Sequence, residues 1–292
     1  MTLPQAIRSY LGLCKLPIAF YAALSAGAGL LLSGRPHAAS LTASVAGVFL
    51  MACGACALNH FQERKTDARM PRTAGRPLPS GRVRPGGARR FALVLIGSGA
   101  VVLLATGAWA APLLGLAAVF WYNGFYTWLK ARHAFAAIPG ALVGALPPAI
   151  GWAAAGAPAD LRLAALCFFF FMWQVPHFLL HQQAYGKEYE AIRLPSLTAL
   201  FSETQLARLT FQWLLAAAVS LQLVVLYGLI QTPLVHAALL AASLGLAARG
   251  GALLGRHAPS YAGLFRSTNV FMLLALLLIF LDRLPAALGW AG

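Results

Sequence analysis

Acidic residues are scarce in this sequence. Only seven of the 292 residues are Asp or Glu, against 22 Lys or Arg, and charged residues make up 10% of the chain. Soluble globular domains carry about 25% charged residues, whereas here 60% of the residues are hydrophobic and the mean hydropathy is +0.73. These values exclude an ordinary soluble domain. They predict an all-α integral membrane protein, which we treat as one polytopic domain over residues 1–292.

Cysteine is also rare, which limits the metal and redox chemistry to be expected. Cys53 and Cys56 form a Cys-x-x-Cys pair inside an apolar run, and no second ligand pair accompanies it. We interpret the pair as small residues on one helix face. The first apolar run has 18 residues, too long for a typical signal peptide, so we expect it to be a retained helix.

The apolar runs predict nine membrane-spanning helices, each close to the ~20 residues that a span requires. If the N-terminus is cytoplasmic, 19 of the 22 Lys and Arg fall on the cytoplasmic side, and only Arg35, Arg162 and Arg283 fall on the other. This asymmetry predicts a multi-pass protein of the cytoplasmic (inner) membrane, with its C-terminus on the opposite side. Because the Lys and Arg residues lie between apolar runs, and no motif that reads nucleic-acid bases occurs, no nucleic acid partner is expected. The expected helices are 17–34, 41–60, 92–110, 112–129, 137–155, 163–181, 209–231, 233–249 and 264–284, and the long polar cytoplasmic loops are 61–91 and 182–208.

Four of the seven acids form two pairs, and each pair follows the cytoplasmic end of an apolar helix. In the first, Asn59, Glu63 and Asp67 are spaced i, i+4, i+8, which on a helix turns by only about 40° per step. Such a ladder of oxygen ligands suits Mg²⁺, which prefers one or two carboxylates together with substrate phosphates. The alternative is a solvated helix end with i, i+4 ion pairs. The bases available to meet the remaining phosphate charge are Arg64, Lys65, Arg69, Arg72 and Arg76.

The second acid pair, Glu188 and Glu190, follows a helix that Pro176 should kink. The two carboxylates are candidate ligands of a second Mg²⁺, although a plain polar loop is the alternative. Lys187 and Arg193 are candidate diphosphate ligands here, and Lys130 lies on the same side of the membrane. His177 and His181, one turn apart, are expected to be packed or substrate-contacting histidines rather than a transition-metal pair.

Two acidic sites among many bases suit the ionisation of an allylic diphosphate, in which bases take up the developing charge of the leaving group. The prenyl cation then requires an apolar, aromatic pocket. Lipid-facing positions in the interfacial belt are the alternative for most of the available aromatic residues. The candidates are Phe168, Phe169, Phe170, Phe171, Trp173, Trp121, Tyr122 and Tyr126.

The motif from Asn59 to Asp67, followed by Arg72-Thr73, Arg76-Pro77-Leu78 and Gly81, resembles the first signature of the UbiA superfamily of intramembrane prenyltransferases. The resemblance implies nine transmembrane helices around a central cavity, and prenyl transfer assisted by two acidic motifs and Mg²⁺. It also implies that Asn59, Glu63 and Asp67 bind Mg²⁺–diphosphate, with help from Arg72, Arg76 and Lys130. The sequence departs from the family in having Glu63 and Glu188 where Asp is frequent, and Cys14-Lys15-Leu16-Pro17 near the start.

Within the superfamily, segments 126–152, 173–178 and 264–282 are similar to the branch that farnesylates heme. That resemblance implies farnesyl diphosphate and heme b as substrates, heme O as product, and heme A synthase or a terminal oxidase assembly as a partner. It places His177 at the heme, with Trp173, Gln174, Phe178 and His181 as substrate contacts. The alternatives are a relative that prenylates an aromatic quinone precursor such as 4-hydroxybenzoate, a membrane transporter, and a scaffold for a respiratory assembly.

Overall fold

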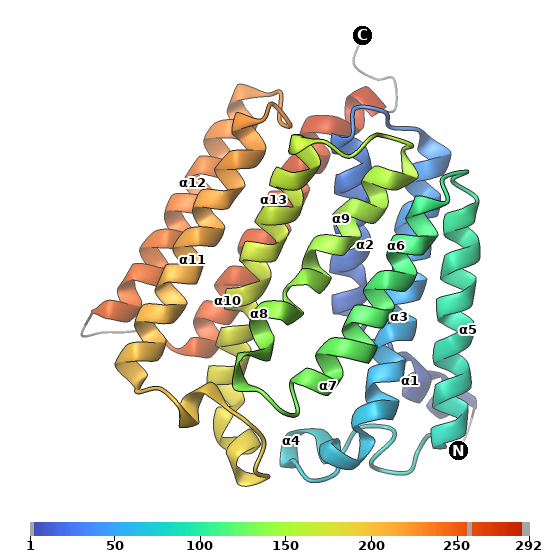
Figure 1. The fold of residues 1–292 in the computed structure, drawn as a ribbon, viewed down its shortest axis with the longest axis vertical. Helices are drawn as coiled ribbons and strands as arrows, with labels where there is room; N and C mark the ends of the chain where they lie inside the picture. Colours follow the sequence, from blue (N-terminus) through green and yellow to red (C-terminus); the bar gives the residue numbers. More distant parts are fainter. Residues whose placement is uncertain (1–2, 256–258, 288–292) are drawn as a thin grey trace.

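The computed structural model describes residues 3–255 and 259–287 of the chain. Within these residues every regular element is helical, and the longer helices run side by side as a bundle (Figure 1). The all-helical architecture predicted from the composition is confirmed. The helices of the first half are α1 (Leu3–Leu13), α2 (Leu16–Leu32), α3 (Ala38–Asp67), α4 (Pro71–Ala74), α5 (Pro85–Leu104) and α6 (Ala110–Val119). Those that follow are α7 (Thr127–Leu129), α8 (Ala137–Gly140), α9 (Leu142–Ala154), α10 (Leu161–Ala191), α11 (Glu203–Leu226), α12 (Pro233–Gly251) and α13 (Tyr261–Ala287).

Each of the nine predicted spans overlaps a helical segment, but nine uninterrupted spans are not confirmed. Over the described part of the chain, seven helical segments are long and apolar enough to cross a membrane, and there are eight if α1 and α2, bent by 53° at their junction, are counted as one broken span. The predicted span 112–129 is built from three pieces, because a π-helix at Phe120–Tyr126 separates α6 from α7. π-Helical turns are frequent at functional sites, and only the short α7 separates this one from Lys130.

Helices α3 and α10 are longer than the sequence pattern predicts. α3 continues to Asp67 and α10 continues through Pro176 to Ala191. Hydropathy marks where side chains leave the apolar layer, whereas a run of Gln, Glu, Arg and Lys favours continuation of the helix itself. The predicted loops 61–91 and 182–208 are therefore too long, since residues 61–67 and 182–191 are helical, and both acid pairs lie on or within the ends of helices.

Glycines allow the closest helix contacts in the bundle. A Cβ atom added to Gly151 of α9 would lie 1.7 Å from the backbone oxygen of Ala26, and one added to Gly29 of α2 would lie 2.0 Å from that of Pro148. Small residues at such contacts are characteristic of helix packing in membranes, where backbones approach closely without a hydrophobic driving force. Helices α2 and α9 are thereby held in a fixed register.

One end of the bundle, which we call the site end, brings together segments that are distant in the sequence. The last turns of α3 and α10 lie there, with α1, α4 and α7 beside them, at the bottom of Figure 1. Arg69, just after α3, donates a hydrogen bond of 3.0 Å to the backbone oxygen of Ile192, just after α10. The two acid-bearing helix ends are therefore tied to one another.

Candidate active site

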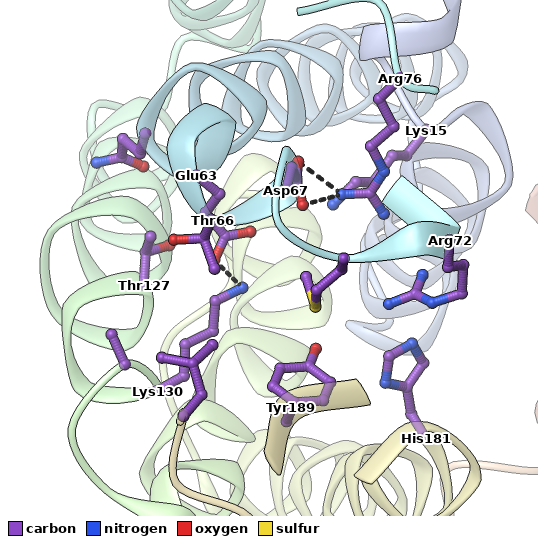
Figure 2. A pocket seen from close by; sticks show the side chains of 14 residues that line it. Lys15, Glu63, Thr66, Asp67, Arg72, Arg76, Thr127, Lys130, His181 and Tyr189 are labelled. Atoms are coloured by element: carbon purple, nitrogen blue, oxygen red, sulfur yellow. Dashed lines mark hydrogen bonds and ion pairs between the residues drawn. The ribbon is translucent and has the colours of Figure 1, made fainter. Parts of the chain in front are cut away.

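A cavity of about 220 Å³ opens at the site end between α3, the segment after it, α7 and the last turns of α10 (Figure 2). Most of the side chains around it are polar or charged, in a chain that has few of them. The lining residues are Lys15, Gln62, Glu63, Thr66, Asp67, Met70, Arg72, Arg76, Thr127, Lys130, Ala131, His181, Tyr189 and Leu194.

Glu63 and Asp67 reach the cavity together, because both lie on the last two turns of α3 and are four residues apart. Glu63 forms an ion pair with Lys130, the residue that follows α7. Burial alone would lower the pKa of Lys130, but the negative charge of Glu63 and the hydrogen bond that Lys130 donates to its carboxylate raise that pKa above its ordinary value. Lys130 therefore stays protonated, and its charge is directed at the cavity.

Asp67 is held by Arg76. Nη1 of Arg76 donates to both carboxylate oxygens of Asp67 at 2.9 Å, and the Asp67 side chain is only 2% exposed (Figure 2). The chain returns to this point because Thr73 donates a hydrogen bond of 2.8 Å to the backbone oxygen of Asp67, which fixes α4 against the end of α3. Local folding of residues 67–76 thus presents one acid and one base to the same cavity.

One member of the second acid pair lies beside the cavity wall, where it contacts the lining residue Arg72. Glu188 Oε2 lies 3.4 Å from Nε of Arg72, whose guanidinium group covers the ring of Tyr185 at 4.3 Å. This carboxylate oxygen is buried and accepts no hydrogen bond from the residues that the structure describes. Tyr189, the next residue, lines the cavity. Both carboxylates of the first acidic motif and one of the second are therefore paired with bases that line the cavity.

Lys15 is the fourth base of the cavity, and its neighbour is an amide rather than an acid. Its Nζ donates a hydrogen bond of 3.2 Å to Oδ1 of Asn59, whose Nδ2 donates to Oγ1 of Thr127 at 3.1 Å. Lys15 adopts the left-handed conformation (φ 46°, ψ 56°) at the junction of α1 and α2. Such backbone strain, costing roughly 1–3 kcal/mol, collects at functional sites. Asn59 itself is buried behind the cavity wall.

The charges around the cavity leave an excess of positive charge. With every group ionised, the lining residues Lys15, Arg72, Arg76 and Lys130 give +4 and Glu63 and Asp67 give −2, which is +2. Glu188, beside the wall on Arg72, reduces the sum to +1. No cluster of three or more His, Cys, Asp or Glu side chains suited to a metal exists in the described residues. A site for Mg²⁺ that uses one or two carboxylates and completes its shell with phosphate and water fits Glu63 and Asp67.

An aromatic wall extends from the cavity along α10. His181 lines the cavity, and His177 lies one turn deeper, with its ring 5.0 Å from that of Trp173 and 4.7 Å from that of Phe265. Phe178 stacks on Tyr126 of the π-helix at 5.2 Å. These rings form an apolar surface beside the charged cavity, as the predicted prenyl-transfer site requires.

The predicted aromatic pocket is formed by only some of its candidates. In the run 168–171, Phe169 and Phe170 are buried in the helix core, whereas Phe168 is 42% exposed on the outside of the bundle. Tyr122 stacks on Tyr126 at 5.9 Å, and Trp121 donates a hydrogen bond to the backbone oxygen of Pro139. Tyr126 is therefore the aromatic residue of this segment that lies next to Lys130 and Phe178.

Several predicted site residues are not brought to the cavity. Arg64 covers the ring of Phe61 and donates to its backbone oxygen at 2.6 Å, and Lys65 and Lys187 are exposed. Glu190 accepts a hydrogen bond from Thr198. Arg193 takes the left-handed position (φ 59°) that ends α10. Gln174 packs against Gly144 of α9.

Sequence reasoning missed several residues at the site. Lys15, Thr66 and Tyr189 line the cavity, and Asn269 of α13 contacts His177. Lys15 carried a visible signal, since it is a base directly before the first apolar run. Tyr189 stands between the two acids of the second pair. Asn269 carried a weaker signal in the sequence, as an amide inside an apolar helix.

The two acids at the other end of the bundle have structural roles. Asp160 caps α10 by accepting the backbone N–H groups of Arg162 and Leu163, both at 3.0 Å. Asp282 accepts those of Gln231 and Thr232 at 3.0 and 2.8 Å, just before α12. Neither acid is available for a second charged site. Among the described residues there are also no ion pairs in the middle of the bundle, which would be expected along the path of a transporter.

Comparison with known proteins identifies the family. Residues 19–275 match the UbiA prenyltransferase family. The protoheme IX farnesyltransferase of Oleidesulfovibrio alaskensis is 36% identical over 282 residues, which cover 95% of this chain and 97% of that protein. The protein of the same name from Geobacter sulfurreducens is 42% identical over 192 residues, covering 65% and 71%.

Solved structures show the same fold. A UbiA homologue from Aeropyrum pernix superimposes with a TM-score of 0.72 at 17% identity, covering 93% of this chain and 98% of that one. A UbiA homologue from Archaeoglobus fulgidus, solved with GPP and Mg²⁺, gives 0.64 at 12% identity, covering 93% and 99%. The chain therefore belongs to the UbiA prenyltransferase family, as a multi-pass membrane prenyltransferase.

Proposed function

We propose that the protein transfers the farnesyl group of farnesyl diphosphate to a vinyl group of heme b, giving heme O. The C1–O bond of farnesyl diphosphate breaks and its electron pair leaves with the diphosphate. The terminal vinyl carbon then bonds to C1 of the farnesyl cation. Water adds to the adjacent carbon and loses a proton, which gives the hydroxyethylfarnesyl group.

The observation that carries this proposal is the cavity whose four lining bases include three that are each paired with a carboxylate and one, Lys15, that has no carboxylate partner in the described residues. We assign the diphosphate to this cavity, where Lys15, Arg72, Arg76 and Lys130 can bind its oxygens. Glu63 and Asp67 would hold Mg²⁺, and Glu188 would hold a second ion. Mg²⁺ bound there would neutralise charge that develops on the leaving diphosphate. The Archaeoglobus homologue solved with GPP and Mg²⁺ supports this assignment.

The bases then exchange partners when substrate binds. In the structure Glu63 is paired with Lys130 and Asp67 with Arg76. We propose that the cations turn to the phosphate oxygens as the carboxylates take up metal, so that neither a carboxylate nor a base is left unpaired in the half-buried cavity. Asn59, whose oxygen is occupied by Lys15, would position that base and stand behind the metal ligands.

The aromatic wall supports the assignment of heme as acceptor. His177, Trp173 and Phe265 offer an imidazole beside flat apolar rings, and the similar relatives named protoheme IX farnesyltransferase favour heme over an aromatic quinone precursor. We assign His177 as a ligand of the heme iron. His181, at the cavity, would lie between the heme and the diphosphate.

The charge distribution supports an orientation in the membrane. We propose that the site end faces the cytoplasm of the inner membrane and that the C-terminus lies on the opposite side, because 19 of the 22 Lys and Arg then lie inside. Both substrates would enter from the cytoplasm or the bilayer. The hydroxylated product suits a next enzyme that oxidises heme O, so heme A synthase or a terminal oxidase assembly is the proposed partner.

The test is a reaction of the purified protein in lipid nanodiscs with heme b, farnesyl diphosphate and Mg²⁺. Chromatography and mass spectrometry should detect heme O, and expression in a strain lacking its own heme O synthase should restore that pigment. Geranylgeranyl diphosphate tests the chain length, and 4-hydroxybenzoate tests the acceptor. Prenylated 4-hydroxybenzoate without heme O would overturn the heme assignment while leaving the prenyl transfer intact.

A further inference from the structure

We propose that Asn269 of α13 is a positioning residue, which orients the His177 ring and fixes its tautomer so that Nε2 faces the iron of the acceptor. This inference rests on the proposed heme acceptor. It concerns a residue on another helix, 92 positions further along the chain, that does not itself touch the iron.

The contact between the two side chains defines the tautomer. Nδ1 of His177 lies 2.9 Å from Oδ1 of Asn269. A carbonyl oxygen only accepts hydrogen bonds, so the proton of a neutral imidazole must be on Nδ1, and Nε2 carries the lone pair. Nε2 has no hydrogen-bond partner among the described residues. It is therefore available as a ligand.

The geometry around Asn269 is held by two further helices. Its backbone oxygen accepts a hydrogen bond of 3.2 Å from Tyr21 of α2, and the backbone oxygen of Thr268 accepts one of 2.9 Å from Trp173 of α10. Trp173 and Phe265 pack against the His177 ring at 5.0 and 4.7 Å between ring centres. The amide is thus anchored at its backbone while its side chain holds the imidazole.

This arrangement is what iron ligation by histidine requires. A metal-bound histidine almost always donates its other ring N–H to an oxygen, which sets the ring orientation and increases the basicity of the ligating nitrogen. Any buried imidazole needs an acceptor for its N–H, but a histidine that served only for packing would also be expected to pair its second ring nitrogen, and Nε2 of His177 has no such partner in the described residues. The amide of Asn269 is explained if it supports a ligand.

The test is a titration of the purified full-length protein in nanodiscs with ferric heme b, followed by absorbance and electron paramagnetic resonance. The wild type should bind heme with the spectrum of histidine ligation, and His177→Gly should lose that spectrum and regain it with added imidazole. Asn269→Leu removes the acceptor and should weaken heme binding by about 10- to 100-fold, with a changed spectrum. Asn269→Asp keeps an acceptor oxygen and should retain the spectrum.

Two controls make the outcome specific. Val270→Ala, at a neighbouring position on the outside of α13 with 63% exposure, should bind heme like the wild type. Binding of farnesyl thiodiphosphate with Mg²⁺ reports folding and should be unchanged in Asn269→Leu. The inference is wrong if Asn269→Leu or His177→Gly binds heme with the wild-type affinity and spectrum. That result would leave the proposed transfer of a farnesyl group to heme unaffected. If the wild type binds no heme, both the inference and the proposed acceptor are wrong.

Discussion

The ammonium group of Lys15 donates its hydrogen bond to the amide oxygen of Asn59, at 3.2 Å, and not to a carboxylate. The other bases of the cavity each face an acid, at Glu63, Asp67 or Glu188. Lys15 is therefore the lining base without a carboxylate partner in the described residues, and it is held in a strained backbone conformation between α1 and α2. A bound anion would pair with the ammonium group of Lys15.

Replacing Lys15 should weaken the binding of the prenyl diphosphate. We expect Lys15→Met to raise KM for farnesyl diphosphate by about 10-fold or more, because a charge-assisted hydrogen bond contributes about 1.5–3 kcal/mol. Lys15→Arg keeps the charge and should recover much of the loss. Steady-state kinetics at saturating heme measure this effect, with Arg208→Met, an exposed base on α11, as the matched control. An unchanged KM in Lys15→Met would exclude Lys15 from the diphosphate site.

Asp67→Asn should abolish most of the activity without unfolding the protein. The substitution keeps the size of the side chain, and the hydrogen bond from Thr73 to the Asp67 backbone oxygen does not depend on the carboxylate. Loss of one charged group that stabilises a transition state costs roughly 100- to 1,000-fold in kcat. Single-turnover prenyl transfer measures this, and a monodisperse elution profile in detergent establishes folding.

Glu203→Gln is the matched control for that experiment, because it neutralises an acid in the first turn of α11, outside the cavity. It should keep the wild-type rate. A comparable loss of rate in both variants would mean that acidity of the site end in general, rather than the Asp67 carboxylate, matters for the reaction.

Exchanging the charges of Glu63 and Lys130 distinguishes a structural ion pair from two separate substrate contacts. We expect Glu63→Lys combined with Lys130→Glu to restore thermal stability relative to either single variant, since the pair can form in either direction. Activity should not recover, because the carboxylate would then stand where phosphate oxygens bind and the ammonium where metal binds. Melting temperature and prenyl-transfer rate are measured on the same four proteins. Recovery of both quantities would assign the pair a purely structural role.

Removal of Mg²⁺ should stop prenyl transfer and leave heme binding intact. The carboxylates of Glu63 and Asp67 lie at the charged cavity, whereas His177 lies one turn deeper on α10. Treatment with EDTA should therefore abolish the formation of heme O, and excess Mg²⁺ should restore it, while the heme absorbance stays constant. Loss of the heme spectrum with EDTA would contradict the separation of the two subsites.

The positions of the helices and of Glu63 with Asp67 could be predicted because both depend on local sequence. An apolar run defines a span, and a four-residue spacing places two side chains on one helix face. The predicted ends of α3 and α10 are wrong, because hydropathy does not report where a backbone stops being helical. The broken span at Phe120–Tyr126 likewise has no signature in hydropathy.

The partners of those acids could not be predicted, because they come from packing. Lys15 reaches Asn59 across 44 positions and Asn269 reaches His177 across 92, through the order in which α2, α3, α10 and α13 pack. Conversely, closeness in the sequence does not ensure a shared cavity: Glu190 is two residues from Glu188, yet its carboxylate accepts a hydrogen bond from Thr198. A charged side chain near a helix end identifies a region of the membrane surface, and only the tertiary fold selects which residues share a cavity.

The contact between α2 and α9 should be the most sensitive packing position in the bundle. In Gly151→Ala the new Cβ atom would meet the backbone oxygen and carbon of Ala26 at 1.7 and 2.6 Å, and backbone cannot move aside as a flexible side chain can. We expect the free energy of unfolding to fall by about 1–3 kcal/mol. The displaced α2 begins next to Lys15, so KM for farnesyl diphosphate should rise as well. Gly245→Ala on α12 is the matched control, because its Cβ atom would meet open space. The alanine should stabilise the helix by up to about 1 kcal/mol through its higher helix propensity. Thermal unfolding in a fixed detergent compares the two, and equal melting temperatures would show that α2 and α9 separate freely at this point.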